Sequence, residues 1–201
     1  MSKDTLKENN QSTKPIIFET VNSEGVVSAI FDWVKNIIMT IIIAFLCFTF
    51  LFRVVRVDGT SMYDTLKNDD LLIVSDLFYT PHNSDIVVID HAEGIDTPIV
   101  KRVIAIEGQT IKLDYQNNKV IVDGETLNEP YIYNDVTFGS QMVNYDIPEV
   151  VPEGKVFVMG DNRDVSLDSR NARVKLIDVK DIIGKAQFVY FPFENIKYLY
   201  S

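Results

Sequence analysis

Three short segments carry side chains whose types and spacing suit hydrolytic chemistry. In the first, VDGTSMYDTL (57–66), Ser61 lies between Gly59 and the turn-forming Asp64. A serine hydroxyl attacks a carbonyl carbon when a neighbouring base takes its proton. Serines beside glycines are also common in ordinary loops, and the segment matches neither Ser-x-x-Lys nor Gly-x-Ser-x-Gly. By itself, the segment leaves a nucleophile and a structural turn both open.

The second segment, IVKRVIAIEG (99–108), places a lysine inside an apolar strand. Side chains alternate between the two faces of a strand, so Lys101 shares a face with Ile99 and Val103, while Arg102 points the other way. An amine directed toward apolar neighbours has a lowered pKa, which suits it to act as a base for a serine. The alternative is an edge-strand lysine whose amine reaches water. Alternation leaves both interpretations open.

The third segment, VFVMGDNRDVSLDSR (156–170), follows a strand with an unusual density of polar side chains. They are Asp161, Asn162, Arg163, Ser166, Asp168, Ser169 and Arg170. So many groups able to bond each other favour a hydrogen-bonded network that supports a site. A turn held by Asp–Arg pairs is the structural alternative.

A long apolar run precedes all three segments. Residues 37–52 contain no charge, and with residues 33–36 they would form a helix about 30 Å long, which matches the core of a bilayer. The run is apolar on every face and lies too far along the chain for a typical cleaved signal peptide. We expect a disordered tail at residues 1–25, followed by an amphipathic segment and transmembrane anchor at residues 26–53.

From residue 54 onward, short β-branched and aromatic runs alternate with turn residues, which predicts a mainly β domain over residues 54–201 with mixed or barrel-like sheets. The predicted strands are LLIV (71–74), IVVI (86–89), IVKRVIAI (99–106), TIKLDY (110–115), KVIVDG (119–124), KVFVMG (155–160) and IIGKAQFVYF (182–191). The fourth and fifth of these predict a hairpin. Residues from about 114 to 150 are a candidate cap insertion.

The composition argues against several classes of protein. The 201-residue chain has 19 basic and 29 acidic residues and a net charge of −10, so we expect no nucleic-acid partner. One cysteine, Cys47, cannot form an intrachain disulfide, and with only His82 and His91 it offers no framework for a metal site. Both histidines lie in polar, turn-like stretches. We therefore expect no metal or cofactor, and no histidine base for the serine.

Taken together and in this order, SMYDTL, IVKRVIAIEG and GDNRDVSLDSR resemble the characteristic segments of the type I signal peptidases, the Ser/Lys-dyad family of bacterial leader peptidases, in their short Gram-positive form. The resemblance covers about residues 35–190. It implies a β catalytic domain behind one transmembrane helix. It also implies a membrane-bound serine endopeptidase that removes signal peptides from secreted preproteins.

The resemblance implies roles for particular residues. Ser61 would be the nucleophile and Lys101 the general base, with the hydroxyl of Ser166 orienting the lysine. The backbone N–H of Ser61 would stabilise the oxyanion. Gly59 stands where some members carry a serine that adds a second donor, so a second donor here depends on Gly59 itself or on water.

The resemblance also implies supporting contacts. Small substrate side chains, one and three residues before the cut, would enter pockets lined by Val57, Met62, Leu66, Ile99 and Val100. Structural ion pairs would join Arg102 to Asp161 and Arg170 to Asp168. One departure is Asp64, which stands where the family usually has proline.

The charges around the apolar run and the resemblance give opposite topologies. Lys35 precedes the run, whereas Arg53 and Arg56 follow it, so a positive-inside count puts the β domain in the cytoplasm. The resemblance implies a single-pass protein of the cell membrane with a cytoplasmic tail and an extracytoplasmic catalytic domain. It would contact membrane lipid, act on signal-peptide-bearing preproteins and work as a monomer.

Two other functions fit parts of the pattern. A self-cleaving Ser–Lys repressor would need a DNA-binding helix-turn-helix and no anchor, which is the reverse of this chain. An inactive homologue could serve as a membrane-anchored assembly or binding factor. The presence of Ser61, Lys101 and Ser166 favours the enzyme.

Overall fold

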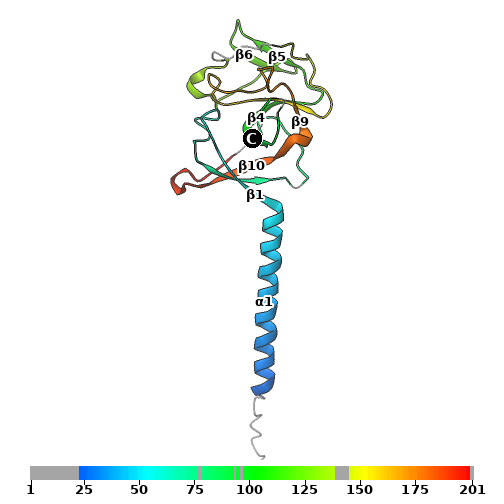
Figure 1. The fold of residues 1–201 in the computed structure, drawn as a ribbon, viewed down its shortest axis with the longest axis vertical. Helices are drawn as coiled ribbons and strands as arrows, with labels where there is room; N and C mark the ends of the chain where they lie inside the picture. The colour runs from blue at the N-terminus through cyan, green and yellow to red at the C-terminus, as the bar shows by residue number, and fades with distance from the viewer. Residues whose placement is uncertain (1–22, 77, 93, 96, 139–144, 200–201) are drawn as a thin grey trace, which may run out of the picture. The chain divides into compact units, whose positions relative to one another are not determined.

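The computed structural model describes residues 23–76, 78–92, 94–95, 97–138 and 145–199. Most of the predicted tail, up to residue 22, and residues 139–144 of the predicted cap lie outside these ranges. One helix, α1 (Ser23–Leu51), leads without a break into β1 (Phe52–Arg56) and the β domain (Figure 1). The chain divides into two compact units, Met1–Leu46 and Cys47–Ser201.

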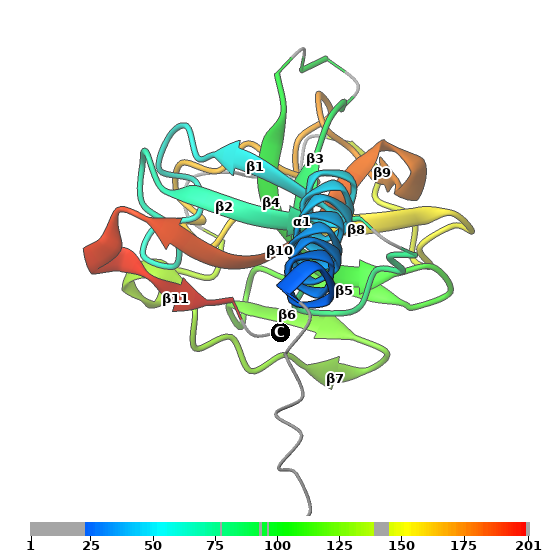
Figure 2. The same cartoon turned by 90° about the horizontal axis from the view of Figure 1, so that it is seen from below.

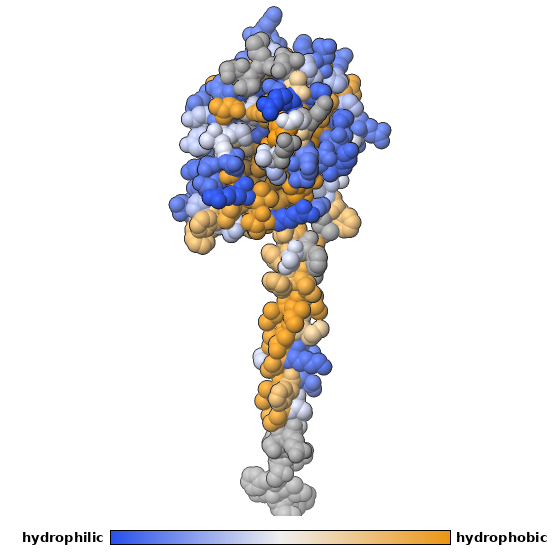
Figure 3. Space-filling view, viewed as in Figure 1, coloured by the Kyte–Doolittle hydropathy of each residue, from blue (hydrophilic) through white to orange (hydrophobic). Residues whose placement is uncertain are grey.

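Helix α1 carries apolar side chains along most of its visible surface (Figure 3). Its stretch Gly25–Leu46 is long and apolar enough, by length and composition, to cross a membrane, and none of the tested stretch is buried within the protein. The predicted amphipathic segment and the predicted anchor are therefore parts of one helix. It begins three residues earlier than the predicted segment.

An eight-stranded antiparallel sheet forms the centre of the β domain. Its order is β1, β2 (Leu71–Ser75), β10 (Ile182–Phe191), β3 (Ile86–Ile89), β4 (Ile99–Ile106), β8 (Lys155–Met159) and β9 (Ile177–Asp178), and β11 (Lys197–Tyr198) pairs with β10. Figure 2 shows β1, β2 and β10 side by side. The pairing register shifts along β10 and β4, and such irregularities bend strands and let the sheet curl.

A smaller antiparallel sheet overlaps the start of the predicted cap. It contains β5 (Ile111–Asp114), β6 (Lys119–Val122) and β7 (Glu125–Thr126). Asp114 pairs with Lys119, which confirms the predicted hairpin. Three short 3₁₀ helices complete the described elements: η1 (Tyr133–Asp135), η2 (Val179–Asp181) and η3 (Phe193–Asn195).

All seven predicted strands form, and the described residues contain four further strands that were not predicted. Strands β7, β9 and β11 are two residues long, which is too short to show a period of two. Strand β1 was missed because its first residue continues the apolar run of the helix.

Three buried clusters hold the β domain together. The first packs the segment after β1 against β2, β3 and β10: Val57, Met62, Leu66, Leu72, Val74, Ile86, Val88, Ala186, Val189 and Leu199. The second joins the small sheet to β4 and β8 around Ile104, Val120 and Phe157. The third packs β3, β4 and β8 against β9. The residues on either side of Ser61 are thereby fixed to the main sheet.

Candidate active site

Ser61 lies in a tight turn between β1 and β2. The turn is closed by the N–H of Tyr63, which donates to the carbonyl of Thr60 (3.1 Å), and by the N–H of Leu66, which donates to Met62 (2.7 Å). Met62 and Leu66 are almost completely buried in the first cluster. The turn therefore holds the half-buried Ser61 over the sheet.

Lys101 reaches Ser61 from β4. Its Nζ donates to Ser61 Oγ at 2.8 Å and to the carbonyl oxygen of Val100 at 2.9 Å. The residue is only 3% exposed, and burial lowers the pKa of Lys101 to about 8, although the charges of Asp168 and Asp161 act in the opposite direction. A buried amine with this pKa beside a hydroxyl is suited to take the proton from it.

Neither histidine takes the place of the lysine. The side chains of His82 and His91 are 75% and 71% exposed, and their ionic neighbours are Asp85 and Asp90. Within the described part of the chain, the side chain that hydrogen-bonds Ser61 Oγ is that of Lys101.

The segment after β8 touches the backbone of the turn that contains Ser61 (residues 60–66). The N–H of Asn162 donates to the carbonyl oxygen of Ser61 at 3.0 Å. Gly160 is so close that a Cβ there would lie 2.4 Å from the same oxygen and 2.2 Å from Ser166 Oγ. The missing side chain of Gly160 therefore lets the two segments approach.

Both ion pairs expected from the resemblance are formed. Arg102 donates to the two oxygens of Asp161 at 2.8 and 2.7 Å, and Arg170 donates to those of Asp168 at 2.8 Å each. Burial by itself would raise the pKa of Asp168, but the hydrogen bonds and charge of Arg170, with the N–H of Gly160, bring it below its usual value. All four charged side chains are buried, so each depends on its partner.

The hydroxyl of Ser166 is not bonded to the lysine. Within the described residues, its buried Oγ has no hydrogen-bond partner of good geometry, although it lies close enough to Asp168 to help lower the pKa of that carboxyl group. The amine of Lys101 is oriented by the carbonyl of Val100 instead. The backbone N–H of Ser166 donates to Asn162 and holds the residue in the turn after β8.

Gly59 adopts a left-handed conformation, with φ of +92°. Its N–H donates to Oδ1 of Asn68 at 2.8 Å. The N–H of Gly59 therefore already donates to Asn68 and is not free to act as the second oxyanion donor that the sequence left open.

A cavity of about 150 Å³ opens beside Ser61 and Lys101. Its lining includes four of the five predicted substrate-pocket residues, Val57, Met62, Ile99 and Val100, together with Val55, Arg56, Asp58, Val88, Thr97 and Pro98. Leu66, the fifth, is completely buried and packs in the core, so it does not line this cavity. The cavity is small, and its lining combines aliphatic side chains with polar and charged ones.

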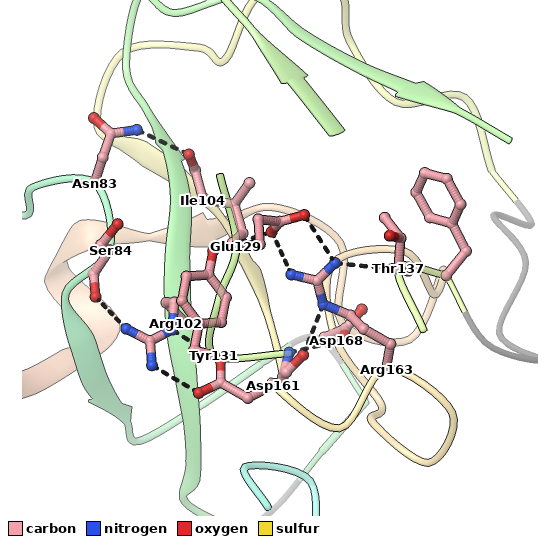
Figure 4. A network of polar contacts seen from close by, with 12 residues as sticks. Asn83, Ser84, Arg102, Ile104, Glu129, Tyr131, Thr137, Asp161, Arg163 and Asp168 are labelled. Carbon is pink, nitrogen blue, oxygen red and sulfur yellow. Dashed lines mark hydrogen bonds and ion pairs between the residues drawn. The ribbon is translucent and has the colours of Figure 1, made fainter. Parts of the chain in front are cut away.

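A second layer of polar contacts, which the sequence did not reveal, surrounds Arg102 (Figure 4). The centre of the Tyr131 ring lies 3.9 Å from the guanidinium carbon of Arg102, and Tyr131 Oη donates to Glu129. Glu129 in turn pairs with Arg163 at 2.5 Å, and Arg163 donates to the carbonyl of Thr137. The pairing of Glu129 with Arg163 spans 34 residues, so no local pattern in the sequence indicates it.

Comparison with known proteins identifies the family. The family model described as signal peptidase, peptidase S26, matches residues 30–191. The chain is 38% identical over 177 residues to a signal peptidase I of Bacillus licheniformis, covering 85% of this chain and 93% of the relative. It is 39% identical over 178 residues to signal peptidase I P of Bacillus subtilis subsp. natto, with coverages of 85% and 94%. A crystal structure of a signal peptidase I from Enterococcus faecalis V583 aligns with a TM-score of 0.44 and 24% identity, over 53% of this chain and 97% of the other. The chain thus belongs to the signal peptidase family, peptidase S26.

Proposed function

We propose that Ser61 and Lys101 form the catalytic dyad of this chain, which as a signal peptidase is a serine endopeptidase that removes signal peptides from preproteins. The observation that carries the assignment is the 2.8 Å contact between Ser61 Oγ and the buried Nζ of Lys101. This distance lies within the range in which a base removes a proton directly.

The reaction runs through a covalent ester. The neutral amine of Lys101 takes the hydroxyl proton as Ser61 Oγ attacks the carbonyl carbon of the last signal-peptide residue. The protonated lysine then gives its proton to the nitrogen of the scissile bond, which leaves as the new N-terminus of the mature protein. Lys101 next takes a proton from a water molecule as its oxygen attacks the ester, and then returns that proton to Ser61 Oγ, which leaves and frees the signal peptide. With a pKa of about 8, roughly a tenth of the lysine is neutral at pH 7.

The oxyanion is stabilised in this proposal by the backbone N–H of Ser61. The N–H of Gly59 is not a ready second donor, since it binds Asn68. Removing one oxyanion donor costs other hydrolases about 3 kcal/mol in the barrier. A group that reaches the oxyanion only when substrate is bound would supply the second donor.

Substrate selection rests on the cavity beside the dyad. Its volume of about 150 Å³ and the aliphatic side chains in its lining suit small side chains close to the scissile bond. Val57, Met62, Ile99 and Val100 are the proposed substrate-contacting residues. Larger substrate side chains at these positions would collide with buried core residues such as Met62.

Helix α1 supports the anchoring part of this proposal. A helix able to cross the bilayer and joined directly to β1 supports a membrane-anchored protein. We assign a single pass through the cell membrane, a cytoplasmic tail at residues 1–25 and an extracytoplasmic catalytic domain at residues 54–201. The domain contacts lipid and works as a monomer, and its substrates are signal-peptide-bearing preproteins.

Cleavage of a preprotein by the full chain in liposomes tests the dyad. Wild type should cut once after the signal peptide, and Ser61→Ala and Lys101→Ala should abolish the cut. Lys101→Arg should fail as well, because a guanidinium keeps its proton near neutral pH. His82→Ala and His91→Ala are the matched controls and should retain activity. Full activity of Lys101→Arg would refute the lysine base, and a folded, inactive wild type would support the assembly-factor alternative.

A further inference from the structure

Thr65 connects the turn that carries the proposed nucleophile Ser61 (residues 60–66, the nucleophile turn) to the buried ion pair behind it. Thr65 Oγ1 donates to Oδ2 of Asp161 at 2.5 Å. The same oxygen accepts from Nη2 of Arg102, and the other oxygen of Asp161 accepts from Nε of Arg102. Asp161 has no exposed surface, so its carboxylate is held by these donors.

Both members of the Arg102–Asp161 ion pair lie next in the chain to residues that contact or form the proposed dyad. Arg102 directly follows Lys101 on β4, and Asp161 directly precedes Asn162, whose N–H donates to the carbonyl of Ser61. One end of the nucleophile turn is thus fixed by Asn162. The other end, four residues after Ser61, is fixed by Asp161 through the hydroxyl of Thr65.

We propose that Thr65 is a positioning residue that sets the distance between the nucleophile and its base. The inference rests on the proposed Ser61–Lys101 dyad. The Arg102–Asp161 pair fixes the turn relative to β4, and the Thr65 hydroxyl is the side-chain link between this pair and the turn. Without it, the turn keeps its buried anchors Met62 and Leu66 but loses the restraint that orients it toward the lysine. A misplacement near 1 Å in such a site costs about a hundredfold in rate.

The substitution Thr65→Val tests this role because it keeps the shape and removes the hydroxyl. We expect kcat to fall roughly 10- to 100-fold, with KM within about twofold of wild type, since the substrate cavity is unchanged. Thr65→Ser keeps the hydroxyl and should recover most of kcat. Thr126→Val makes the same chemical change at an exposed position in β7 and should leave kcat unchanged.

The assay uses the full chain in detergent or liposomes, with Ser61→Ala measured in parallel. Wild-type kcat in Thr65→Val, or equal loss in Thr65→Val and Thr65→Ser, would overturn the positioning role. If Thr65→Val does not fold, Thr65→Ser and Thr65→Ala are compared instead. The kcat of Thr65→Ser should then exceed that of Thr65→Ala by the same roughly 10- to 100-fold. Equal kcat values in these two variants would overturn the role. Activity remaining in Ser61→Ala would instead refute the dyad, so the two failures are distinguishable.

Discussion

The amine of Lys101 lies 2.8 Å from the hydroxyl of Ser61, although 40 residues separate them in the chain. The lysine is buried and the serine is half-buried. The pKa of the lysine and the rate of the reaction therefore depend on the same feature, the exclusion of water from the amine.

Activity should rise with pH as Lys101 loses its proton. Burial lowers the pKa of Lys101 to about 8, and only the neutral amine acts as a base. We expect kcat/KM to increase about tenfold per pH unit below pH 7 and to level off above pH 9. Initial rates of preprotein cleavage across this range measure the profile. A rise in activity with its midpoint near pH 6.5 would indicate a histidine base instead.

The same burial should make stability depend on pH. The pKa of Lys101 is lowered from 10.5 to about 8 on folding, so between these values the unfolded chain binds a proton that the folded chain does not. Stability contributed by this group therefore rises with pH across that window, on the order of 3 kcal/mol in all. Lys101→Met lacks this dependence.

Denaturant unfolding of wild type and Lys101→Met in detergent, at pH 8 and pH 10, isolates the effect. The unfolding free energy of wild type, relative to that of Lys101→Met, should increase as the pH rises. A difference that stays constant would mean that the amine keeps an ordinary pKa in the folded protein.

Gly160→Ala should impair catalysis. The added Cβ would lie 2.4 Å from the carbonyl oxygen of Ser61 and 2.2 Å from Ser166 Oγ, so the nucleophile turn must move. We expect kcat to fall about a hundredfold. Gly154→Ala is the control, because open space surrounds that position and any cost there is local backbone strain. Wild-type kcat in Gly160→Ala would show that the turn tolerates displacement.

Ser166→Ala should not destabilise the fold. The buried hydroxyl has no hydrogen-bond partner of good geometry among the described residues, and an unpaired buried polar group costs about 1–3 kcal/mol. Thermal unfolding should therefore occur at the same or a higher temperature than in wild type. A clear loss of stability would show that the hydroxyl bonds Lys101 or Asp168 in solution, in line with the role implied by the resemblance.

Much of the fold was readable from the sequence because the relevant signals are local. Strand β4 was predicted with its observed bounds, since an eight-residue apolar and β-branched run shows its period directly. Alternation also separated Lys101 from Arg102. It did not reveal that both are buried, because the second face of β4 is covered by Asp161 and Tyr131 from distant segments.

The parts of the site that were missed depend on tertiary contacts. Asn68 binds the N–H of Gly59, and Thr65 binds Asp161 across 96 residues. Neither residue belongs to a pattern that predicts its partner: Asn68 reaches Gly59 across the loop between β1 and β2, and Thr65 meets Asp161 only after the intervening strands have paired. Leu66 was assigned to the substrate pocket by position, whereas packing turns it into the core.

The late position of β10 in the sequence determines when the two halves of the main sheet can be joined. The turn with Ser61 lies beside β1 and β2, Lys101 lies on β4, and in the sheet β10 separates β2 from β3. Because β10 begins at Ile182, the strand that joins the two halves is synthesised after both Ser61 and Lys101. The two residues of the proposed dyad are therefore held in one sheet only after a later strand has been made and has paired with both halves.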